Sequence, residues 1–362
     1  MRLSRLEIRR LRRLAEVALL PGPGLNLLVG DNGAGKTSVL EAIHLLAYGR
    51  SFRGRVRDGL VASDAPALEV YAEWNEETGG GRRRKAGLRH AGQAWEGRLD
   101  GQPVASLGDL CAALAAVSFE PGSHALVSGG GEARRRYVDW GLFHVEPDFL
   151  PLWRRYARAL KQRNSLLKQR VRDGQLDAWD HELAEVGEPM TRLREAYLAQ
   201  LQVPLGAISG ELAPMLGPAG IEFHPGWRRD ELSLADALLL ARDRDLQSGF
   251  TSIGPHRADW HVSHGALPNG ETLSRGQAKL TALTCVLAQA EHYVERRGEW
   301  PVVLLDDLAS ELDRAHQQRV LARLAAGQAQ VFVTGTELPA EAALRGHEHV
   351  VFHVEQGRVD PA

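Results

Sequence analysis

Cysteine and long apolar runs are both scarce in this sequence of 362 residues. Its two cysteines, Cys111 and Cys285, have no metal-binding spacing and are too few for a disulfide framework. We expect both to be buried thiols, because free cysteine behaves as a small apolar side chain. No run approaches the roughly 20 apolar residues that a membrane helix needs.

An excess of charge of one sign is also lacking. Lys and Arg together number 44, and Asp and Glu together number 46. The protein is therefore not basic overall, and any surface that binds nucleic acid must be a local basic patch. Arginines crowd the first 13 residues, but no uninterrupted apolar segment follows them, which argues against a secretory signal. These absences predict a soluble, cytoplasmic protein.

The hydrophobic pattern divides the chain into an α/β part and a helical insertion. Strand patterns cover 3–29, 67–74 and 85–99, and helical spacing covers 36–47, 276–296 and 314–326, with buried strands at 302–305 and 331–333. The middle of the chain is helical, with breaks expected at 173–174 and 187–189. We therefore predict an α/β head over 1–138 and 247–362 and a compact helical lobe over 139–246.

A phosphate-binding loop lies between an expected strand and an expected helix. The segment reads Gly30, Asp31, Asn32, Gly33, Ala34, Gly35, Lys36, Thr37 and Ser38. Its glycines let backbone amides surround phosphate oxygens, and the helix N-terminus adds a positive dipole end. Lys36 should bridge the β- and γ-phosphates of ATP, and Thr37 should bind Mg²⁺. A chance glycine-rich turn is the alternative, which the flanking strand and helix disfavour.

Two acids follow the apolar strand at 302–305. A P-loop needs a carboxylate at the end of a neighbouring strand, so we assign Asp306 to Mg²⁺ and Asp307 to the general base that orients the attacking water. Taken alone, the two acids are also compatible with a polar turn at the end of a strand.

A third segment, Ser274, Arg275, Gly276 and Gln277, opens the expected helix before these acids. Alone it would be an ordinary helix cap, although a helix N-terminus is also a good place to meet a γ-phosphate. The order of P-loop, insertion, this segment, acidic strand and the segment 310–313 resembles that of ATP-binding cassette ATPases. In that class both segments line a dimer interface, and the resemblance implies that residues 274–277 and Asp313 lie at the partner's nucleotide.

Within that class the chain resembles the RecF family over nearly its whole length. The segments 49–53, 129–139, 251–257 and 306–313 carry the resemblance. The chain departs from the family pattern at Gly122 and Gly131, where an acid and a proline are usual, so the backbone of the 120–132 loop is freer than the resemblance implies. Many cassette ATPases sense Mg²⁺ with a glutamine, for which Glu120 is the candidate substitute.

The resemblance implies an α/β fold of the ABC-type ATPase head, with a mixed sheet, a small antiparallel β layer and no long coiled coil. It implies ATP and Mg²⁺ as cofactors and an ATP-dependent homodimer in which Ser274 and Gly276 cap the partner's nucleotide. Hydrolysis of ATP would be weak and stimulated by DNA, and it would time the release of the dimer. Many cassette ATPases have Glu at the position of Asp307. Because Asp is the shorter side chain, the substitution Asp307→Glu would speed hydrolysis. The implied partners are duplex or gapped DNA, RecR-like and RecO-like mediators and the RecA recombinase, in DNA damage repair, replication and the SOS response.

Several basic clusters could contact DNA through its backbone, with steep salt dependence and little sequence preference. They are the arginines of residues 2–13, the clusters at 50–57, 82–85 and 134–136, and a helical stretch with Arg154, Arg155, Arg158, Lys161, Arg163, Lys168 and Arg170. Each cluster alone is more simply a solvated face. Two other functions stay open: the ATPase subunit of an ABC transporter, and a DNA scaffold that binds nucleotide without hydrolysing it.

Overall fold

The computed structural model describes residues 1–54, 59–63, 65–78, 80–91, 94–170, 174–267 and 272–362. The chain divides into two units, one formed by residues 1–123 and 274–362 and the other by residues 124–273. The lobe expected at 139–246 lies inside the second unit, which extends further at both ends. None of the described helices combines the length and apolar character that crossing a bilayer requires.

A six-stranded sheet forms the centre of the first unit. Its order is β14 (Arg358–Pro361), β13 (His349–Glu355), β3 (Leu25–Val29), β12 (Val331–Gly335), β11 (Val302–Leu305) and β8 (Ala116–Phe119). The strands from β13 to β8 are parallel, and only β14 is antiparallel to its neighbour. Because β3, β12 and β11 are parallel neighbours, the residues that follow them meet at one edge of the sheet.

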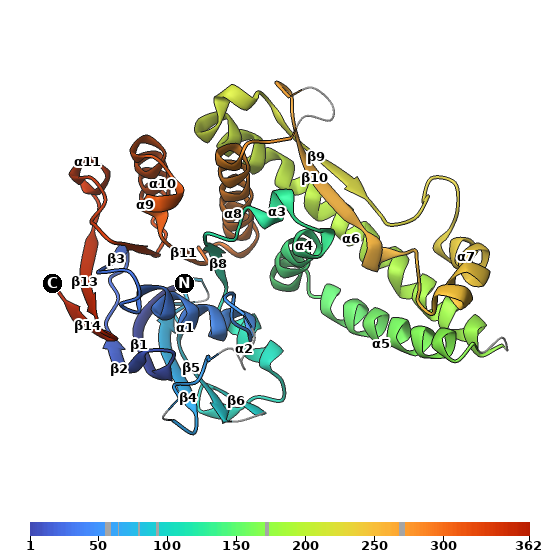
Figure 1. Ribbon diagram of the computed structural model, residues 1–362, viewed down its shortest axis with the longest axis horizontal. Helices are drawn as coiled ribbons and strands as arrows, with labels where there is room; N and C mark the ends of the chain where they lie inside the picture. Colours follow the sequence, from blue (N-terminus) through green and yellow to red (C-terminus); the bar gives the residue numbers. More distant parts are fainter. Residues whose placement is uncertain (55–58, 64, 79, 92–93, 171–173, 268–271) are drawn as a thin grey trace. The chain divides into compact units, whose positions relative to one another are not determined.

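Helices cover both faces of this sheet. The helix α1 (Lys36–Tyr48) contacts this sheet and also the strands of a second sheet, so 11 of its 13 residues are buried. In Figure 1, the opposite face carries α8 (Arg275–Arg297), α9 (Leu308–Glu311), α10 (Arg314–Ala326) and α11 (Glu341–Leu344). The expected helix and strand starts at 36, 302 and 314 are confirmed.

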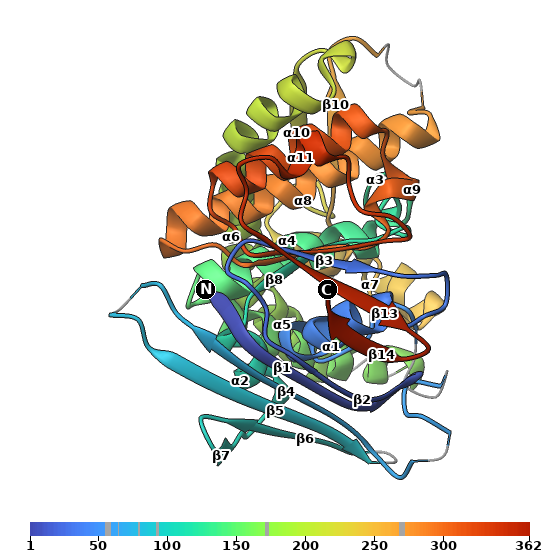
Figure 2. The same ribbon diagram turned by 90° about the vertical axis from the view of Figure 1, so that its left-hand side faces the viewer.

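The second sheet is antiparallel throughout and is the small β layer expected from the sequence (Figure 2). Its order is β2 (Leu14–Leu19), β1 (Arg2–Leu11), β4 (Leu68–Asn75), β5 (Arg83–Ala91), β6 (Ala94–Leu99) and β7 (Gln102–Pro103), and α2 (Leu107–Ala113) packs on β6. The single strand-like piece expected at 85–99 was wrong, because these residues belong to two strands. The pattern at 3–19 likewise forms two strands, joined at Arg12 in the left-handed conformation.

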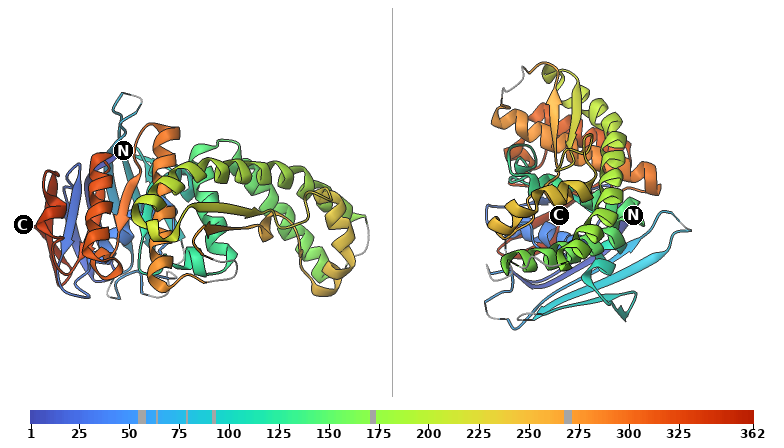
Figure 3. Two further views of the ribbon diagram at one scale, coloured as in Figure 1. Left: turned by 90° about the horizontal axis from the view of Figure 1, so that it is seen from above. Right: turned by 90° about the vertical axis from the view of Figure 1, so that its right-hand side faces the viewer.

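The second unit is mainly helical, with α3 (Ala125–Ser128), α4 (Gly131–Val145), α5 (Phe149–Lys168), α6 (Gln175–Leu212) and α7 (Leu234–Ser248). It also holds the antiparallel pair β9 (Ala219–His224) and β10 (Asp259–His264). The sequence pattern predicted neither strand, and it placed the residues of β9 in the helical lobe and those of β10 in the α/β head. Two short 3₁₀ turns, Pro214–Leu216 and Pro255–Arg257, lie beside these strands. Figure 3 shows α5 and α6 running side by side.

The helix break expected at 187–189 was wrong. The helix α6 continues through both Pro189 and Pro204. A proline in a helix interior removes one hydrogen bond and costs about 3 kcal/mol. Here the buried seam continues on both sides of Pro189, from Leu183 to Leu198, so tertiary packing outweighs the local preference. The other expected break, at 173–174, falls partly on residue 173, outside the described residues.

Of the two cysteines, Cys285 is buried, as expected, but Cys111 is only half-buried. Burial raises the pKa of the Cys285 thiol to about 12 and that of the Cys111 thiol to about 11. Neither thiol is therefore ionised near neutral pH, and neither suits a reactive role.

A buried ion network holds three helices of the second unit together. Arg163 of α5 is fully buried; its Nε lies 2.5 Å from Asp180 Oδ1 and its Nη1 lies 2.7 Å from Asp245 Oδ2. Arg242 of α7 donates to the other oxygen of Asp180 at 2.6 Å. Thr251 accepts a further bond from Arg163 at 2.9 Å. The network therefore joins α5, α6, α7 and the start of the 251–257 segment.

Replacing Arg163 with methionine should destabilise this unit strongly, because Asp180 and Asp245 would lose a buried counter-charge. Breaking a buried pair from one side costs about 3–5 kcal/mol. Urea denaturation followed by far-ultraviolet circular dichroism would measure the loss. Arg155→Met is the matched control: Arg155 pairs with Glu182 on the surface at 3.0 Å, and surface pairs contribute at most about 1 kcal/mol. Equal effects of the two substitutions would contradict this account.

Candidate functional site

The loop that joins β3 to α1 has a backbone conformation that favours glycine at two positions. Gly33 and Gly35 have φ angles of 80° and 121°, in the region that side chains disfavour. A Cβ at Gly30 would collide with the carbonyl oxygen of Val354 on β13. The glycines expected to surround phosphates are thus also required by the local backbone and its packing.

Lys36 begins α1 and bends back over this loop. Its Nζ donates to the carbonyl oxygens of Gly30 and Asp31 at 2.6 and 2.8 Å. Burial lowers the pKa of Lys36, and the nearby charges of Asp307, Asp306 and Asp31 oppose that shift. The ammonium group is therefore held at the mouth of the loop, where it could contact phosphate oxygens.

Hydroxyl groups from two elements fix the carboxylate of Asp306, which follows β11. Thr37 Oγ1 donates to Asp306 Oδ1 at 2.9 Å, and Thr334 Oγ1 donates to the same oxygen at 2.7 Å. Burial raises the pKa of Asp306, and the neighbouring charge of Asp307 raises it further, against these hydroxyl bonds. Thr37 and Asp306 offer hard oxygen ligands side by side, as Mg²⁺ requires.

Asp307 adopts the left-handed conformation, with φ 51° and ψ 43°. Its amide donates to Thr334 Oγ1 at 2.8 Å, and its Oδ2 accepts a bond from Ser310 Oγ at 2.6 Å. Thr334 thus orients both acids. Sequence analysis had assigned no role at the site to Thr334, because its bonds to the two acids span 27 and 28 positions.

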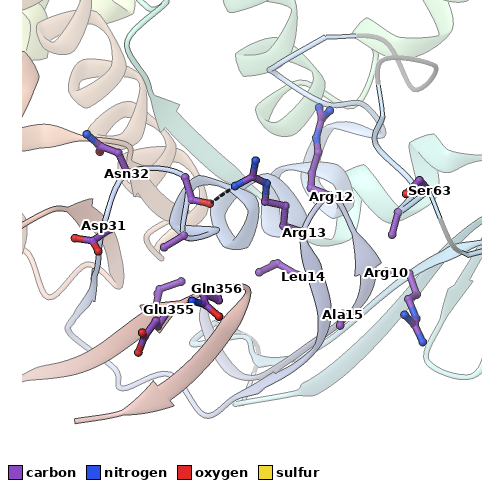
Figure 4. A pocket seen from close by; sticks show the side chains of 14 residues that line it. Arg10, Arg12, Arg13, Leu14, Ala15, Asp31, Asn32, Ser63, Glu355 and Gln356 are labelled. Atoms are coloured by element: carbon purple, nitrogen blue, oxygen red, sulfur yellow. Dashed lines mark hydrogen bonds between the residues drawn. The ribbon is translucent and has the colours of Figure 1, made fainter.

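Two cavities adjoin the P-loop. One, of about 370 Å³, is lined by Arg12, Arg13, Asn32, Gly33, Gly35, Lys36, Thr37, Ser38, Arg53, Pro121, Asp306, Asp307 and Thr334. The other, of about 590 Å³, shares Arg12, Arg13, Asn32 and Gly33 with the first and extends to the turn after β13 (Figure 4). The first holds the phosphate-binding groups, so an oligophosphate could lie there with its organic part in the second.

Arginines from the turn after β1 reach these cavities, which sequence analysis had not expected. Arg12 donates from Nε and Nη2 to the carboxylate of Glu41, at 3.1 and 2.9 Å. Glu41 lies on α1, is fully buried, and also accepts a bond from Ser51. Arg13 Nη1 donates to the carbonyl of Gly33 at 3.3 Å (Figure 4). The sequence shows that the N-terminus is rich in arginine. The contact between Arg12 and Glu41 of α1, however, depends on the fold and could not be predicted from the sequence.

Glu120, the candidate substitute for a glutamine, directly follows β8. Phe119 and Leu305 are paired across β8 and β11, so Glu120 and Asp306 leave neighbouring strands at the same level. The amide of Glu120 donates to Ser123 Oγ at 2.8 Å. Burial raises the pKa of Glu120 to about 7, aided by the charges of Asp306 and Glu41, while Arg53 opposes the shift. A third carboxyl group therefore stands beside the two acids.

The residues 274–277 are not brought to this cavity. Ser274 and Gln277 form a capping box at the start of α8, with bonds of 2.8 and 3.3 Å, and Arg275 and Gly276 are exposed. Within the described ranges, none of these four residues lines either cavity. Asp313 is likewise exposed and caps α10 by accepting from the amide of His316 at 2.9 Å, a bond that lowers the pKa of Asp313.

Comparison with known proteins identifies the family. The model of the RecF/RecN/SMC N-terminal domain matches residues 2–357. The DNA replication and repair protein RecF of Stenotrophomonas maltophilia is 66% identical, over 99% of both chains. That of Thioalkalivibrio sulfidiphilus is 42% identical, over 98% of both.

Solved structures agree with this match. The recombination mediator protein RecF with ATP, in the RecFOR pathway, superposes with a TM-score of 0.87 at 27% identity, covering 99% of this chain and 97% of that one. The Smc head domain of Pyrococcus furiosus gives a TM-score of 0.60 at 16% identity and covers 99% of this chain and 95% of that one, which shows a shared fold alone. The fold expected from the sequence, an ABC-type head with an antiparallel β layer, is thereby confirmed.

The raised pKa of Glu120 predicts how its substitution changes stability with pH. The folded protein holds this proton up to about pH 7, while the unfolded chain releases it near its ordinary value of 4.5. Between these values the unfolded state binds fewer protons, so the contribution of Glu120 to stability falls as pH rises.

Glu120→Gln removes this contribution. Without added metal, its melting temperature relative to the wild type should therefore rise between about pH 5 and 7 and stay level above. Scanning fluorimetry across this range would test it, with Glu348→Gln, on an exposed loop, as the control. A difference that does not change with pH would contradict the burial of this carboxyl group.

Proposed function

The chain belongs to the RecF family, and from this membership and the cavity at Lys36 we propose that it is an ATP-dependent DNA-binding clamp of recombinational repair and replication maintenance. One observation carries the proposal. The P-loop, Thr37 and the two acids share a single cavity, while the exposed helix start at Ser274 lies outside the lining of that cavity. Such a site suits a nucleotide completed by a second copy of the chain.

Within one protomer, each group at the cavity has a role that follows from its position. The amides of residues 30–38 and the ammonium of Lys36 bind the phosphates. Thr37 and Asp306 would hold Mg²⁺, which neutralises phosphate charge when bound. Asp307, oriented by Thr334 and Ser310, accepts the proton of the attacking water.

The start of α8 supplies what the cavity lacks. Its exposed Ser274, Arg275 and Gly276 present backbone amides, a positive dipole end and a guanidinium group, all of which attract a γ-phosphate. A Cβ at Gly276 would meet nothing within 4 Å, so there is open space in front of this turn. In the dimer this turn caps the partner's nucleotide, and Asp313 lies at the same interface.

ATP then acts as a timer for a cytoplasmic clamp. The binding of ATP joins two protomers on duplex DNA, including the junctions of gapped DNA. Slow hydrolysis of ATP, stimulated by DNA, then separates the protomers. The relatives' place in replication, repair and the RecFOR pathway extends the proposal to RecR-like and RecO-like mediators and to loading of the RecA recombinase. Family membership argues against the transporter subunit, and the non-hydrolysing scaffold is distinguished by the second experiment below.

Complementation between two inactive variants tests the sharing of the site. Lys36→Met should lose the γ-phosphate contact, and Ser274→Arg should block the cap, so neither alone should dimerise with ATP. A mixture forms heterodimers in which one site combines an intact P-loop with an intact cap, so dimers and part of the phosphate release should return. Sedimentation with ATP and duplex DNA would measure the recovery of dimers, and a phosphate-release assay would measure the recovery of hydrolysis. A mixture as inactive as its components would refute a shared site.

Asp307→Asn separates assembly from hydrolysis. The amide keeps the size of the side chain but cannot accept a proton, so phosphate release should fall about 10²–10⁴-fold. ATP-dependent dimers should persist and outlast those of the wild type. The control is Asp360→Asn, a substitution of an acid on β14. Unchanged phosphate release would show that Asp307 is not the base, and undetectable release by the wild type would favour the non-hydrolysing scaffold.

A further inference from the structure

The basic clusters of the sequence differ in how far nearby acids neutralise them. In the N-terminal cluster, Arg2 pairs with Glu77 at 2.7 Å, Arg9 with Glu16 at 3.1 Å and Arg12 with Glu41 at 2.9 Å. Across the antiparallel sheet, Glu16, Arg9, Glu69, Arg89 and Glu96 stand in one transverse row of alternating charge. In this row each arginine therefore stands between carboxylates.

Two further clusters are similarly occupied. Arg82 and Arg84 share Asp100 at 3.1 and 2.8 Å. Arg134 is buried against Asp259 at 2.6 Å, and Arg136 pairs with Glu132. Of the cluster at 50–57, Arg53 lies 3.9 Å from Glu41, and residues 55–57 lie outside the described residues.

The helix α5 behaves differently. It contains six basic residues and no acidic residue. Two of the six are compensated: Arg163 is buried among acids, and Arg155 pairs with Glu182. Arg154, Arg158, Lys161 and Lys168 are exposed, and no carboxylate among the described residues lies within ion-pair distance of them. We call these four residues, together with Ser165, the α5 stripe.

The α5 stripe lies on one face of the helix. Positions 154, 158, 161, 165 and 168 follow helical spacing and fall within about 80° of arc. The buried residues of α5, which include Tyr156, Ala159, Arg163 and Leu167, occupy the opposite side. From Arg154 to Lys168 the stripe rises by 14 residue steps, which is about 21 Å or roughly six base pairs of duplex.

Folding does not require such a stripe. Like charges at positions i and i+4, such as Arg154 and Arg158, destabilise a helix, and a solvated face needs no single sign of charge. Here the self-repulsion is unrelieved, although Arg155, one position away, is paired. Ser165 and the neighbouring Gln162 add neutral hydrogen-bond donors, which also suit phosphate oxygens.

We infer that the α5 stripe is a contact surface for the phosphate backbone of duplex DNA. The inference rests on the proposed function for the choice of DNA as the polyanion, and on the ion-pair distribution for the choice of α5. Because the stripe carries lysine and arginine without an aromatic platform or a base-reading motif, it recognises the backbone and not the sequence.

The test compares two triple variants that remove the same charge. The stripe variant is Arg154→Gln, Arg158→Gln and Lys161→Gln. The matched control, Arg155→Gln, Arg228→Gln and Arg345→Gln, removes three exposed arginines that have ion pairs at 3.0 to 3.4 Å. Full-length proteins with ATP are titrated into a fluorescently labelled duplex, and anisotropy is measured between about 50 and 200 mM salt.

The stripe variant should bind the duplex more weakly, on the order of tenfold for each lysine or arginine that no longer reaches a phosphate at about 0.1 M salt. The slope of log affinity against log salt should fall by about 0.9 for each of these side chains. The control should keep the wild-type slope. Both variants should fold and dimerise with ATP, because all six positions are exposed.

Unchanged affinity and slope in the stripe variant, or weaker binding with an unchanged slope, would overturn the inference. It would also fail if the stripe variant lost only binding to poly-glutamate, since the partner would then be an acidic protein surface. A wild-type protein that bound no duplex at any salt concentration would instead contradict the proposed function.

Discussion

The hydrogen bond from Thr37 to Asp306 joins residues 269 positions apart, and the rest of the site depends on it. It is possible because β3 and β11 are parallel with β12 between them, so that all three strands end at one edge. Thr334 at the end of β12 binds the same carboxylate oxygen and also holds the amide of Asp307. One buried carboxylate thus fixes the start of α1, the end of β12 and the direction of the second acid.

The burial of α1 explains how a turn of the antiparallel sheet contributes to the site. A helix enclosed between two sheets cannot leave a charged side chain such as Glu41 uncompensated, because an unpaired buried charge is strongly destabilising. Arg12 supplies the counter-charge, and the left-handed conformation at Arg12 directs the chain there. The same turn places Arg13 beside Gly33, so compensation of a core charge also brings cations to the phosphate-binding loop.

Sequence patterns predicted what is local and missed what depends on distant contacts. The P-loop, the strand before Asp306 and the cap at Ser274 were predicted because each is a continuous segment with its own geometry. Thr334, Glu41 and Arg12 were not assigned roles at the nucleotide site, because only the order of the strands brings them to the cavity. The break expected at Pro189 failed for the same reason: a buried seam on the far side of the proline outweighed the local signal.

The balance of charge at the cavity bears on the proposal that two protomers share the site. The acids at the two cavities are Asp31, Glu41, Glu120, Asp306, Asp307 and Glu355, and the cations are Arg10, Arg12, Arg13, Lys36 and Arg53. These groups nearly cancel, so a triphosphate would add several negative charges to a site with no positive excess. A divalent cation held by Thr37 and Asp306 would offset part of this charge. In the dimer that we propose, the helix start at Ser274, with Arg275 beside it, is exposed and has the sign of charge to offset the remainder.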